Sequence, residues 1–143
     1  MIRLTEVTSQ DVEQIKEWTA SDEWHAYLKP SSAESYVTGN GLLSFCIQDD
    51  KGPVVFVRFD KDGDLLRVAT QFAPVSVVSK RRLIAGIITA LVPSIVSVGK
   101  ENGLKGAVYE SVSPTLINFM SKFGFKAAGN DDYVLTFEEQ KDV

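Results

Sequence analysis

The sequence has one cysteine and one histidine among its 143 residues, and these scarcities exclude several classes of protein. Because Cys46 is alone, no intramolecular disulfide can form, and its place in an apolar segment predicts a buried, inert thiol in a reducing compartment. Because His25 is alone, sites with several histidine ligands are excluded and a Ser-His-Asp hydrolase is disfavoured. We therefore expect a cytoplasmic protein without a metal site.

Positive net charge and long apolar runs are also missing. The formal charge of -4 argues against a protein that binds phosphate backbones, so we expect no nucleic-acid partner. Residues 1–6 lack the basic flank and apolar core of a signal peptide. The most apolar stretch, 83–98, is interrupted by Gly86, Pro93 and polar residues, and falls short of the ~20 apolar residues of a membrane span. We expect no membrane partner.

The composition is that of an ordinary globular chain. Apolar residues make up 44% and charged residues 24%, which is enough apolar surface for a core. We see no repeat, linker or change in composition, and we expect one domain over 1–143.

Alternation of apolar and polar residues predicts an antiparallel meander over 43–72. Its three strands are expected at 43–48, 54–59 and 65–72, separated by turns at 49–52 and 60–64. Asp60, Asp62 and Asp64 resemble the start of a calcium loop. Gly63 is misplaced for such a loop and Gln71 stands where the bidentate Glu would be, so we predict a solvated hairpin turn.

Helical spacing predicts the other elements. A short strand over 2–7 leads to Ser9 as the cap of a first helix, and one or two short helices are expected within 21–40. The longest helix is expected over 79–102, where apolar residues recur over four turns and Pro93 should bend or divide it. A strand follows from Leu104 to Glu110, and a hairpin over 125–137 closes the fold.

The best-defined element lies between these last strands. Ser113 is a good N-cap, Pro114 suits the first helical position, and Gly124 suits the left-handed C-terminal residue. Leu116 and Met120 lie on the apolar stripe of this short helix.

The strand, capped helix, Gly-Phe, strand order resembles the C-terminal half of the GCN5-related N-acetyltransferase (GNAT) superfamily. The family pattern is Asn, two residues, Ala, two residues, Phe-Tyr, then Lys and Leu-Gly-Phe. Ser113 stands in the Asn place, Leu116 in the Ala place and Phe119-Met120 in the Phe-Tyr place, and Lys122 and 123–125 complete the match. The family Tyr often protonates the leaving thiolate, which Met120 cannot do.

The resemblance implies an α/β (α+β) fold with a mixed, mostly antiparallel sheet of six to seven strands and about four helices. It also implies acetyl-CoA as cosubstrate and direct acetyl transfer to an amine, which would be a small molecule or a peptide. The segment 21–40 would shape the acceptor pocket. Two alternatives are a GNAT-like binding module that has lost catalysis and a chain that dimerises through its sheet edges.

The first turn of the long helix is the predicted phosphate site. Helix N-termini favour anions, so three consecutive cations after Ser79 are unfavourable there unless an anion binds or they are simply solvated. In GNAT enzymes this place holds the pyrophosphate, in a loop with two small residues. Starting the family pattern at Lys80 puts Leu83 and Ala85 in the glycine places, and starting it at Arg81 puts Ile84 and Gly86 there. The predicted cofactor-binding residues are Phe72, Ala73, Ser79, Lys80, Arg81, Arg82, Leu83, Ile84, Ala85, Ser113 and Phe119.

The resemblance places the reaction where the strand over 65–72 parts from the strand that ends at Glu110. Residues 71–73 would flank this gap on one side and residues 109–111 on the other. A carboxylate there can take the proton of an attacking amine. Glu110 is the predicted base and Tyr109 or Tyr133 a possible acid, although a Glu at a strand end is also typical of a solvated rim. Arg58 and Arg67 could hold an acidic acceptor, and we favour a solvated sheet face for both.

Overall fold

The computed structural model describes residues 1–21, 33–38 and 41–137. Its strands are β1 (Arg3–Thr5), β2 (Leu43–Asp49), β3 (Gly52–Asp62), β4 (Leu65–Phe72), β5 (Gly106–Glu110), β6 (Lys126–Gly129) and β7 (Asp132–Thr136). Its helices are η1 (Ser9–Asp11), α1 (Val12–Ser21), α2 (Ser35–Thr38), α3 (Lys80–Gly86), η3 (Ile87–Leu91), α4 (Val92–Glu101) and α5 (Pro114–Ser121).

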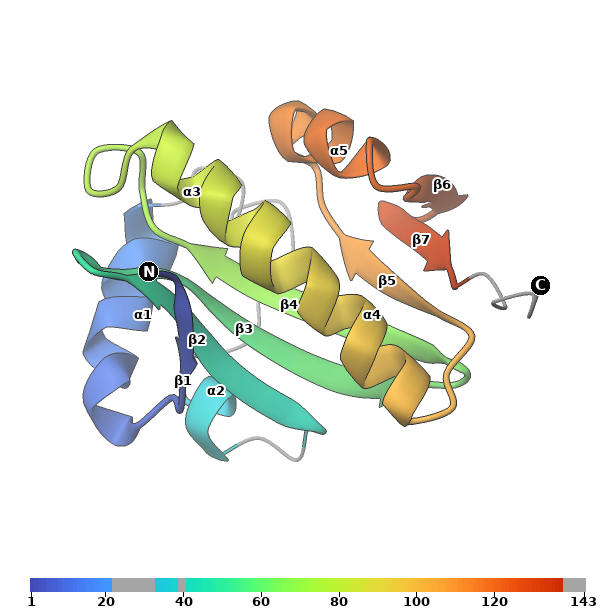
Figure 1. The fold of residues 1–143 in the computed structure, drawn as a ribbon, viewed down its shortest axis with the longest axis horizontal. Helices are drawn as coiled ribbons and strands as arrows, with labels where there is room; N and C mark the ends of the chain where they lie inside the picture. Colours follow the sequence, from blue (N-terminus) through green and yellow to red (C-terminus); the bar gives the residue numbers. More distant parts are fainter. Residues whose placement is uncertain (22–32, 39–40, 138–143) are drawn as a thin grey trace.

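The strands form one sheet in the order β1-β2-β3-β4-β5-β7-β6 (Figure 1). Every neighbouring pair is antiparallel except β4 and β5, which are parallel because the long helix connects them. This mixed, mostly antiparallel sheet confirms the predicted fold class. The two predicted hairpins form, but their turns are shorter than the predicted 49–52 and 60–64. Strand β3 extends to Asp62, and Asp60 and Asp62 pair with β4, so only residues 50–51 and 63–64 lie between the strands.

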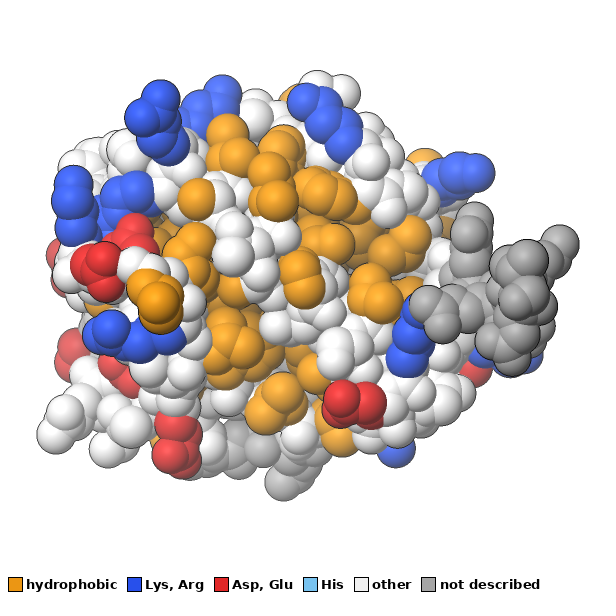
Figure 2. Space-filling view, in the orientation of Figure 1, with side chains coloured by type: hydrophobic (Ala, Val, Ile, Leu, Met, Phe, Trp, Pro, Cys, Tyr) orange, Lys and Arg blue, Asp and Glu red, His pale blue; other side chains and the backbone are white. Residues whose placement is uncertain are grey.

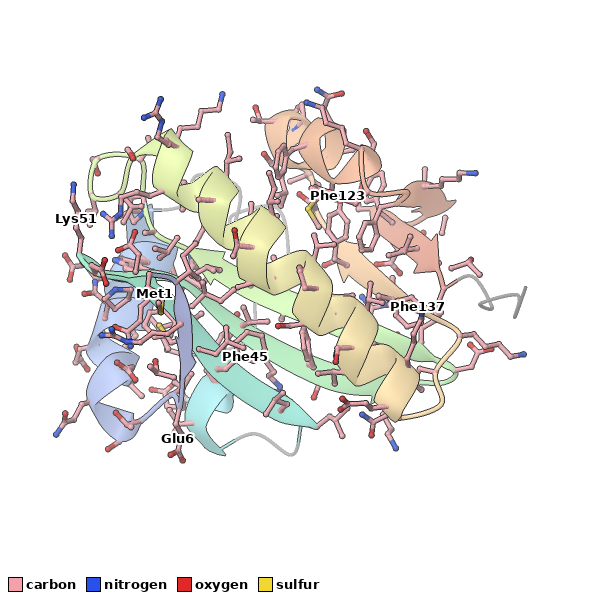
Figure 3. The ribbon with its side chains drawn as sticks, viewed as in Figure 1. Met1, Glu6, Phe45, Lys51, Phe123 and Phe137 are labelled. Atoms are coloured by element: carbon pink, nitrogen blue, oxygen red, sulfur yellow. The ribbon has the colours of Figure 1, made fainter. Side chains whose placement is uncertain are left out.

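Each face of the sheet is covered by helices, because successive strand residues point to opposite faces. The long helix α3–η3–α4 and α5 cover one face, where Phe45, Phe59, Leu66 and Met120 share a buried cluster (Figures 1 and 3). Figure 3 shows the Phe45 side chain on β2 near this helix. A second cluster lies under α1 and α2, and it contains Cys46, whose burial raises the pKa of the thiol to about 11. The expectation of a buried, protonated cysteine is confirmed.

The helix from Lys80 to Glu101 is continuous, but its middle turn is π-helical. This turn, η3, ends two residues before Pro93, which has no N–H for a normal α-helical bond. Pro93 therefore does not divide the helix as predicted, and the irregularity next to it is the π-helical turn. With 22 residues, the helix is long and apolar enough to cross a membrane by length and composition, so the expectation that this region falls short was wrong. Core helices pass the same test, and this one buries one face on the sheet.

The predicted ends of the short helix α5 are confirmed. The Ser113 hydroxyl accepts from the Leu116 N–H at 3.4 Å, and Gly124 has the expected positive φ of 103°. At the other end of the chain the prediction was wrong by one residue. Thr8 is the N-cap, and its N–H donates to the Asp11 carboxylate at 2.8 Å, while Ser9 already lies in η1. The predicted short helix within 21–40 is represented by α2, and His25 lies outside the described residues.

Candidate active site

Strands β4 and β5 pair over only three residues and then part. The parallel register ends at the pair Arg67–Val108, while β4 continues to Phe72 and β5 to Glu110 (Figure 1). We call the region beyond this pair the β4–β5 opening. The predicted parting of these two strands is confirmed.

The edge of β4 that faces the opening carries main-chain groups without a strand partner. The Ala73 N–H donates to the Val54 carbonyl on the β3 side at 2.9 Å. Because alternate residues of an antiparallel strand direct both polar groups to the same side, the N–H and C=O groups of Thr70 and Phe72 point toward the opening. The described part of β5 offers them no ladder bond, since its pairing with β4 ends at Val108. A ligand with amide groups could pair with this edge as a strand does.

Gln71 is one of the few polar side chains buried in the described core, with 1% of its surface exposed. Its Nε2 donates to the Phe72 carbonyl at 3.1 Å, and its Oε1 accepts from the Thr19 hydroxyl of α1 at 2.9 Å. One carbonyl at the opening therefore already has a donor.

The helix start beside the opening has two free main-chain donors and two exposed cations. Ser79 is the N-cap, and its hydroxyl accepts from the Arg82 N–H at 3.3 Å, while the Leu83 N–H bonds to the Ser79 carbonyl. The remaining first-turn N–H groups belong to Lys80 and Arg81, whose side chains are exposed and form no ion pair among the described residues. Figure 2 shows Lys and Arg side chains at the end of the face where α3 begins. This arrangement suits an anion.

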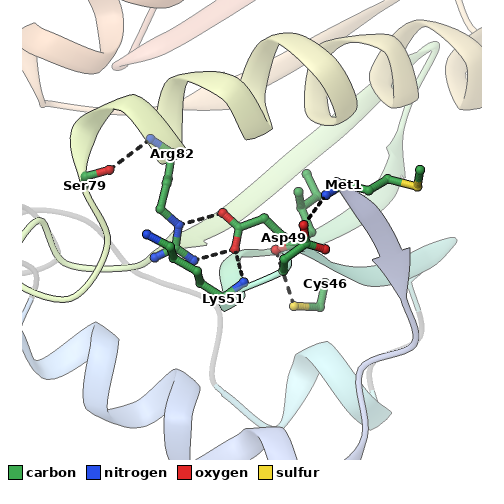
Figure 4. Close-up of polar contacts among 8 residues, drawn as sticks. Met1, Cys46, Asp49, Lys51, Ser79 and Arg82 are labelled. Atoms are coloured by element: carbon green, nitrogen blue, oxygen red, sulfur yellow. Dashed lines mark hydrogen bonds and ion pairs between the residues drawn. The ribbon is translucent and has the colours of Figure 1, made fainter.

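Arg82 differs from its two neighbours. Its Nε and Nη2 each lie 2.6 Å from one carboxylate oxygen of Asp49, at the end of β2 (Figure 4). These bonds, together with the N–H of Lys51, lower the pKa of Asp49 to about 2. The Arg82 side chain is thus paired inside the protein, and its predicted contact with a cofactor would require this pair to open.

The other predicted residues of this segment turn toward the protein. Leu83 packs against the cluster under α1, and Ile84 and Ala85 are half-buried. Gly86, which the second pattern alignment put in a glycine place, is buried, and a Cβ there would lie 3.4 Å from Val54. Gly86 therefore faces the sheet and not the helix start where the phosphates are predicted. Phe72 borders the core under the long helix, and Ala73 is buried in the opposite cluster.

Glu110, the predicted base, is exposed at the end of β5 and lies opposite Asp132 of β7. Arg67 reaches across β5, and its two Nη atoms each lie 3.2 Å from an Asp132 oxygen, while its Nε lies 2.8 Å from Asp62. Among the described residues, no ion pair involves Glu110. Arg58 is paired with Asp60. Both arginines are thus neutralised by aspartates on the sheet, which does not favour an acidic acceptor.

Tyr109 and Tyr133 form a stacked pair on the opposite face of the sheet from Glu110. Their ring centroids are 5.5 Å apart, and Tyr109 also contacts Phe125 edge-on at 5.0 Å. The Tyr109 hydroxyl is buried and has no hydrogen-bond partner within 1–21, 33–38 and 41–137, and burial with the nearby Tyr133 raises its pKa to about 12. A donor without a partner is available to a ligand atom that reaches it.

Helix α5 carries the last predicted residues. Ser113 caps its N-terminus, and Phe119 is half-buried, in contact with Phe123 at 5.5 Å and with the Lys122 ammonium 5.8 Å above its ring. Met120 is buried in the same cluster as Tyr109. The site therefore gathers β4, the start of α3, the end of β5 and α5, but it does not put every predicted side chain in contact with the opening.

A separate groove lies on the far side of the long helix. It has a volume of about 440 Å³, and Ile2, Leu4, Thr89, Pro93 and Ser97 are among its lining residues. None of the predicted site residues lines it.

Sequence reasoning placed Gln71 beside the opening, but it missed Thr19 and Asp49 as parts of this region. Their contacts with Gln71 and Arg82 join residues 52 and 33 positions apart, which no local pattern indicates.

Comparison with solved structures identifies the fold. An acetyltransferase of the GNAT family from Staphylococcus aureus Mu50 superposes with a TM-score of 0.71 over 96% of this chain and 100% of its own, at 15% identity. The ribosomal-protein-S18-alanine N-acetyltransferase of Escherichia coli gives 0.67 over 99% and 97%, at 14% identity. The aminoglycoside acetyltransferase AAC(6')-Ib, solved with paromomycin and acetyl-CoA, gives 0.67 over 99% of both chains, at 17% identity.

No protein-family profile matches the chain, and no curated protein matches it by sequence. At these identities the similarity establishes architecture. The chain has the GNAT fold, in a divergent form.

Proposed function

We propose that this protein is an acetyl-CoA-dependent N-acetyltransferase that transfers the acetyl group directly to a small-molecule or peptide amine. The observation that carries the proposal is the β4–β5 opening, because its free β4 edge suits the amide-containing arm of CoA. The solved AAC(6')-Ib complex, which contains acetyl-CoA, supports the choice of cosubstrate.

In this proposal the two ends of the cosubstrate use two parts of the site. The phosphates lie at the helix start, where the Lys80 and Arg81 N–H groups and side chains provide positive charge. The pantetheine arm pairs with Thr70 and Phe72, and Phe119 and Ser113 border it from α5. The Arg82 side chain does not contact the phosphates in this proposal, because it is paired with Asp49; Arg82 contributes only its positive charge in the first turn of α3.

The reaction balances with residues on the two faces of the sheet. The amine nitrogen attacks the thioester carbon, a C–N bond forms and the C–S bond breaks. Glu110 accepts the proton from the nitrogen, and the CoA sulfur leaves as a thiolate that takes a proton from Tyr109 or Tyr133. We favour Tyr109 of the two, because its buried hydroxyl has no hydrogen-bond partner among the described residues and is not already engaged as a donor.

Calorimetry and thermal unfolding with acetyl-CoA test the proposal. Micromolar binding is expected, and a ligand at 100 times its Kd stabilises the fold by ~2.7 kcal/mol. Thiol release is then followed with a panel of aminoglycosides, polyamines and peptides. The proposal is rejected if millimolar acetyl-CoA gives neither heat nor a shift in Tm.

A second candidate is a GNAT-like binding module that has lost catalysis. Met120 favours it, because the family acid at that position is missing and methionine donates no proton. Tight CoA binding without thiol release for any amine, together with binding of CoA and acetyl-CoA at equal affinity, would support this candidate over the enzyme.

A further inference from the structure

The Gln71 side chain is buried between α1 and the end of β4, beside the β4–β5 opening. No step of the reaction proposed above uses it. Its side chain is fully buried, yet both ends of its carboxamide are engaged, by Thr19 of α1 and by the Phe72 carbonyl. We propose that Gln71 is a positioning residue that keeps the free edge of β4 formed before CoA enters. This inference rests on the proposed function for the identity of the ligand.

Where β4 and β5 part, the Phe72 carbonyl loses its strand partner, and Gln71 replaces it. A partly buried main-chain carbonyl without a strand partner is less stable unless it finds another donor. The Phe72 carbonyl faces the opening, where β5 no longer pairs, and the Gln71 Nε2 lies 3.1 Å from it. The side chain thus takes the place of the missing strand at this position.

The Phe72–Ala73 peptide is consequently held on both sides. On the side of the opening, the Phe72 carbonyl accepts from Gln71. On the side of β3, the Ala73 N–H donates to the Val54 carbonyl at 2.9 Å. A peptide plane fixed at both ends cannot rotate into the opening. The neighbouring Phe72 N–H is thereby kept available for a ligand that pairs with the edge.

The Phe72 carbonyl decides which end of the carboxamide meets Thr19. This carbonyl can only accept, so Nε2 must face Phe72 and Oε1 must face the Thr19 hydroxyl, whereas the reversed amide would set two carbonyl oxygens against each other. The Thr19 oxygen lies 2.9 Å from Gln71 Oε1 and also 2.9 Å from the Ile15 carbonyl one turn earlier in α1, and its single proton can serve one of these acceptors at a time. Helix α1 therefore holds, through Gln71, the β4 edge to which a ligand in the opening would bind. Such preorganisation strengthens binding without adding a ligand contact.

The test compares CoA affinity, measured by calorimetry, in variants that remove one bond each. Gln71→Met keeps the length of the side chain and removes both polar ends, and it is expected to weaken CoA binding about tenfold. Thr19→Val is expected to weaken it about threefold. Because both substitutions act on one chain of hydrogen bonds, the double variant should bind no more weakly than Gln71→Met alone.

Two control variants separate positioning from general loosening. Ser21→Ala removes a hydroxyl that bonds to the Glu17 carbonyl four residues earlier, as Thr19 does, but has no contact with the sheet among the described residues. Ile15→Val loosens the core under α1 and lowers Tm without touching the hydrogen bonds of Gln71. Both should bind CoA as the original protein does.

A rescue variant tests whether the hydrogen-bond donor at position 71, and not only the size of the side chain, supports CoA binding. In Gln71→Glu the neutral acid can donate to the Phe72 carbonyl and the carboxylate cannot, and burial favours the neutral form as pH falls. Its CoA affinity, taken relative to the original protein at the same pH, should recover between pH 8 and pH 5.5. Gln71→Met should show no such recovery.

Hydrogen exchange of the Ala73 amide in the ligand-free protein provides a readout that needs no CoA. It should exchange at least tenfold faster in Gln71→Met than in Ile15→Val at matched Tm. Equal exchange in these two variants, or a Gln71→Met variant with unchanged CoA affinity, would overturn the inference. Failure of the original protein to bind CoA would instead overturn the proposed function, and the exchange comparison would still decide the role of Gln71.

Discussion

Asp49 shows how a single carboxylate organises the start of the long helix. It binds Arg82 through two hydrogen bonds of 2.6 Å and also accepts the Lys51 N–H at 2.9 Å, with about one fifth of its side chain exposed. Its neighbour Asp50 is three-quarters exposed and is paired only with the N-terminal amine. The two adjacent aspartates therefore form a natural comparison between an enclosed ion pair and a solvated one.

We predict that Asp49→Asn lowers the free energy of unfolding by about 1–2 kcal/mol at pH 7, and that Asp50→Asn changes it little. The pKa of Asp49 is depressed to about 2, so its stabilisation is fully present above its ordinary pKa of 3.8 and is lost as pH falls through 2. The difference between the original protein and Asp49→Asn in urea titrations should accordingly narrow from pH 4 to pH 2. A difference that stays constant over this range would contradict the assignment.

Tyr109 is a second residue whose role can be separated from packing. Its buried hydroxyl has no partner in the part of the chain that the structure describes, so Tyr109→Phe removes an unsatisfied group and should leave Tm unchanged or raise it. If the hydroxyl protonates the departing thiolate, turnover of any acetyl acceptor should fall at least tenfold in the same variant. Tyr133→Phe tests the alternative donor, because its ring stacks on Tyr109 and would stay in place. A loss of turnover in Tyr133→Phe that Tyr109→Phe does not show would assign the proton to Tyr133 instead.

At the scale of elements, the first turn of α3 combines a cap, a structural arginine and two solvated cations. Sequence reasoning treated Lys80, Arg81 and Arg82 alike, because a helical pattern does not say which side chain meets a carboxylate from another strand. The structure assigns Arg82 to Asp49 and leaves Arg81 exposed. Residues next to one another in sequence thus have different roles.

Arg81→Glu should weaken CoA binding about tenfold while leaving Tm unchanged or slightly raised. An acidic residue suits the positive end of a helix and stabilises it by ~0.3–1 kcal/mol, whereas it repels the phosphates of a bound nucleotide. Lys100→Glu makes the same change of charge at the other end of the continuous helix and should not affect the Kd. A large fall in Tm for Arg81→Glu would show that this side chain is structural, and equal effects of the two substitutions on the Kd would point to net charge alone.

The elements that sequence reasoning located best are those with local signals. Ser113, Pro114 and Gly124 mark both ends of α5 because caps depend on residues within one turn. The prediction of the short strand β1 was the least accurate, since only three of the predicted residues pair with β2. Pairing at a sheet edge depends on the neighbouring strand, which local patterns do not contain.

At the scale of the whole molecule, the fold could be predicted from the order of elements, but the contacts that build the site could not. Arg67 and Asp132 are 65 residues apart, and Thr19 and Gln71 are 52 apart, so only the assembled sheet brings them together. An alternating strand reads as buried on one face and solvated on the other. Gln71 lies on the face that would be solvated if α1 did not cover it.

The sheet also sets the two proposed catalytic groups on opposite faces. Because consecutive strand residues point in opposite directions, Tyr109 faces the helices α4 and α5, while Glu110 faces the other side, beside Asp132. An amine that approaches from the side of Glu110 and a thiolate that leaves on the side of Tyr109 would then use separate proton paths. This division is a property of the strand at the opening and requires no contact between the two side chains.

Glu110→Gln should therefore lower turnover by 10²–10⁴ without changing the Kd of acetyl-CoA, because it removes the base and leaves the cosubstrate edge intact. Asp131→Asn replaces an exposed carboxylate in the neighbouring turn, and this matched control should keep full turnover. If Glu110→Gln retains full turnover across the pH range, water removes the proton and Glu110 is only a solvated residue at the end of β5. If turnover and acetyl-CoA affinity fall together, Glu110 acts on the shape of the opening and not on the proton.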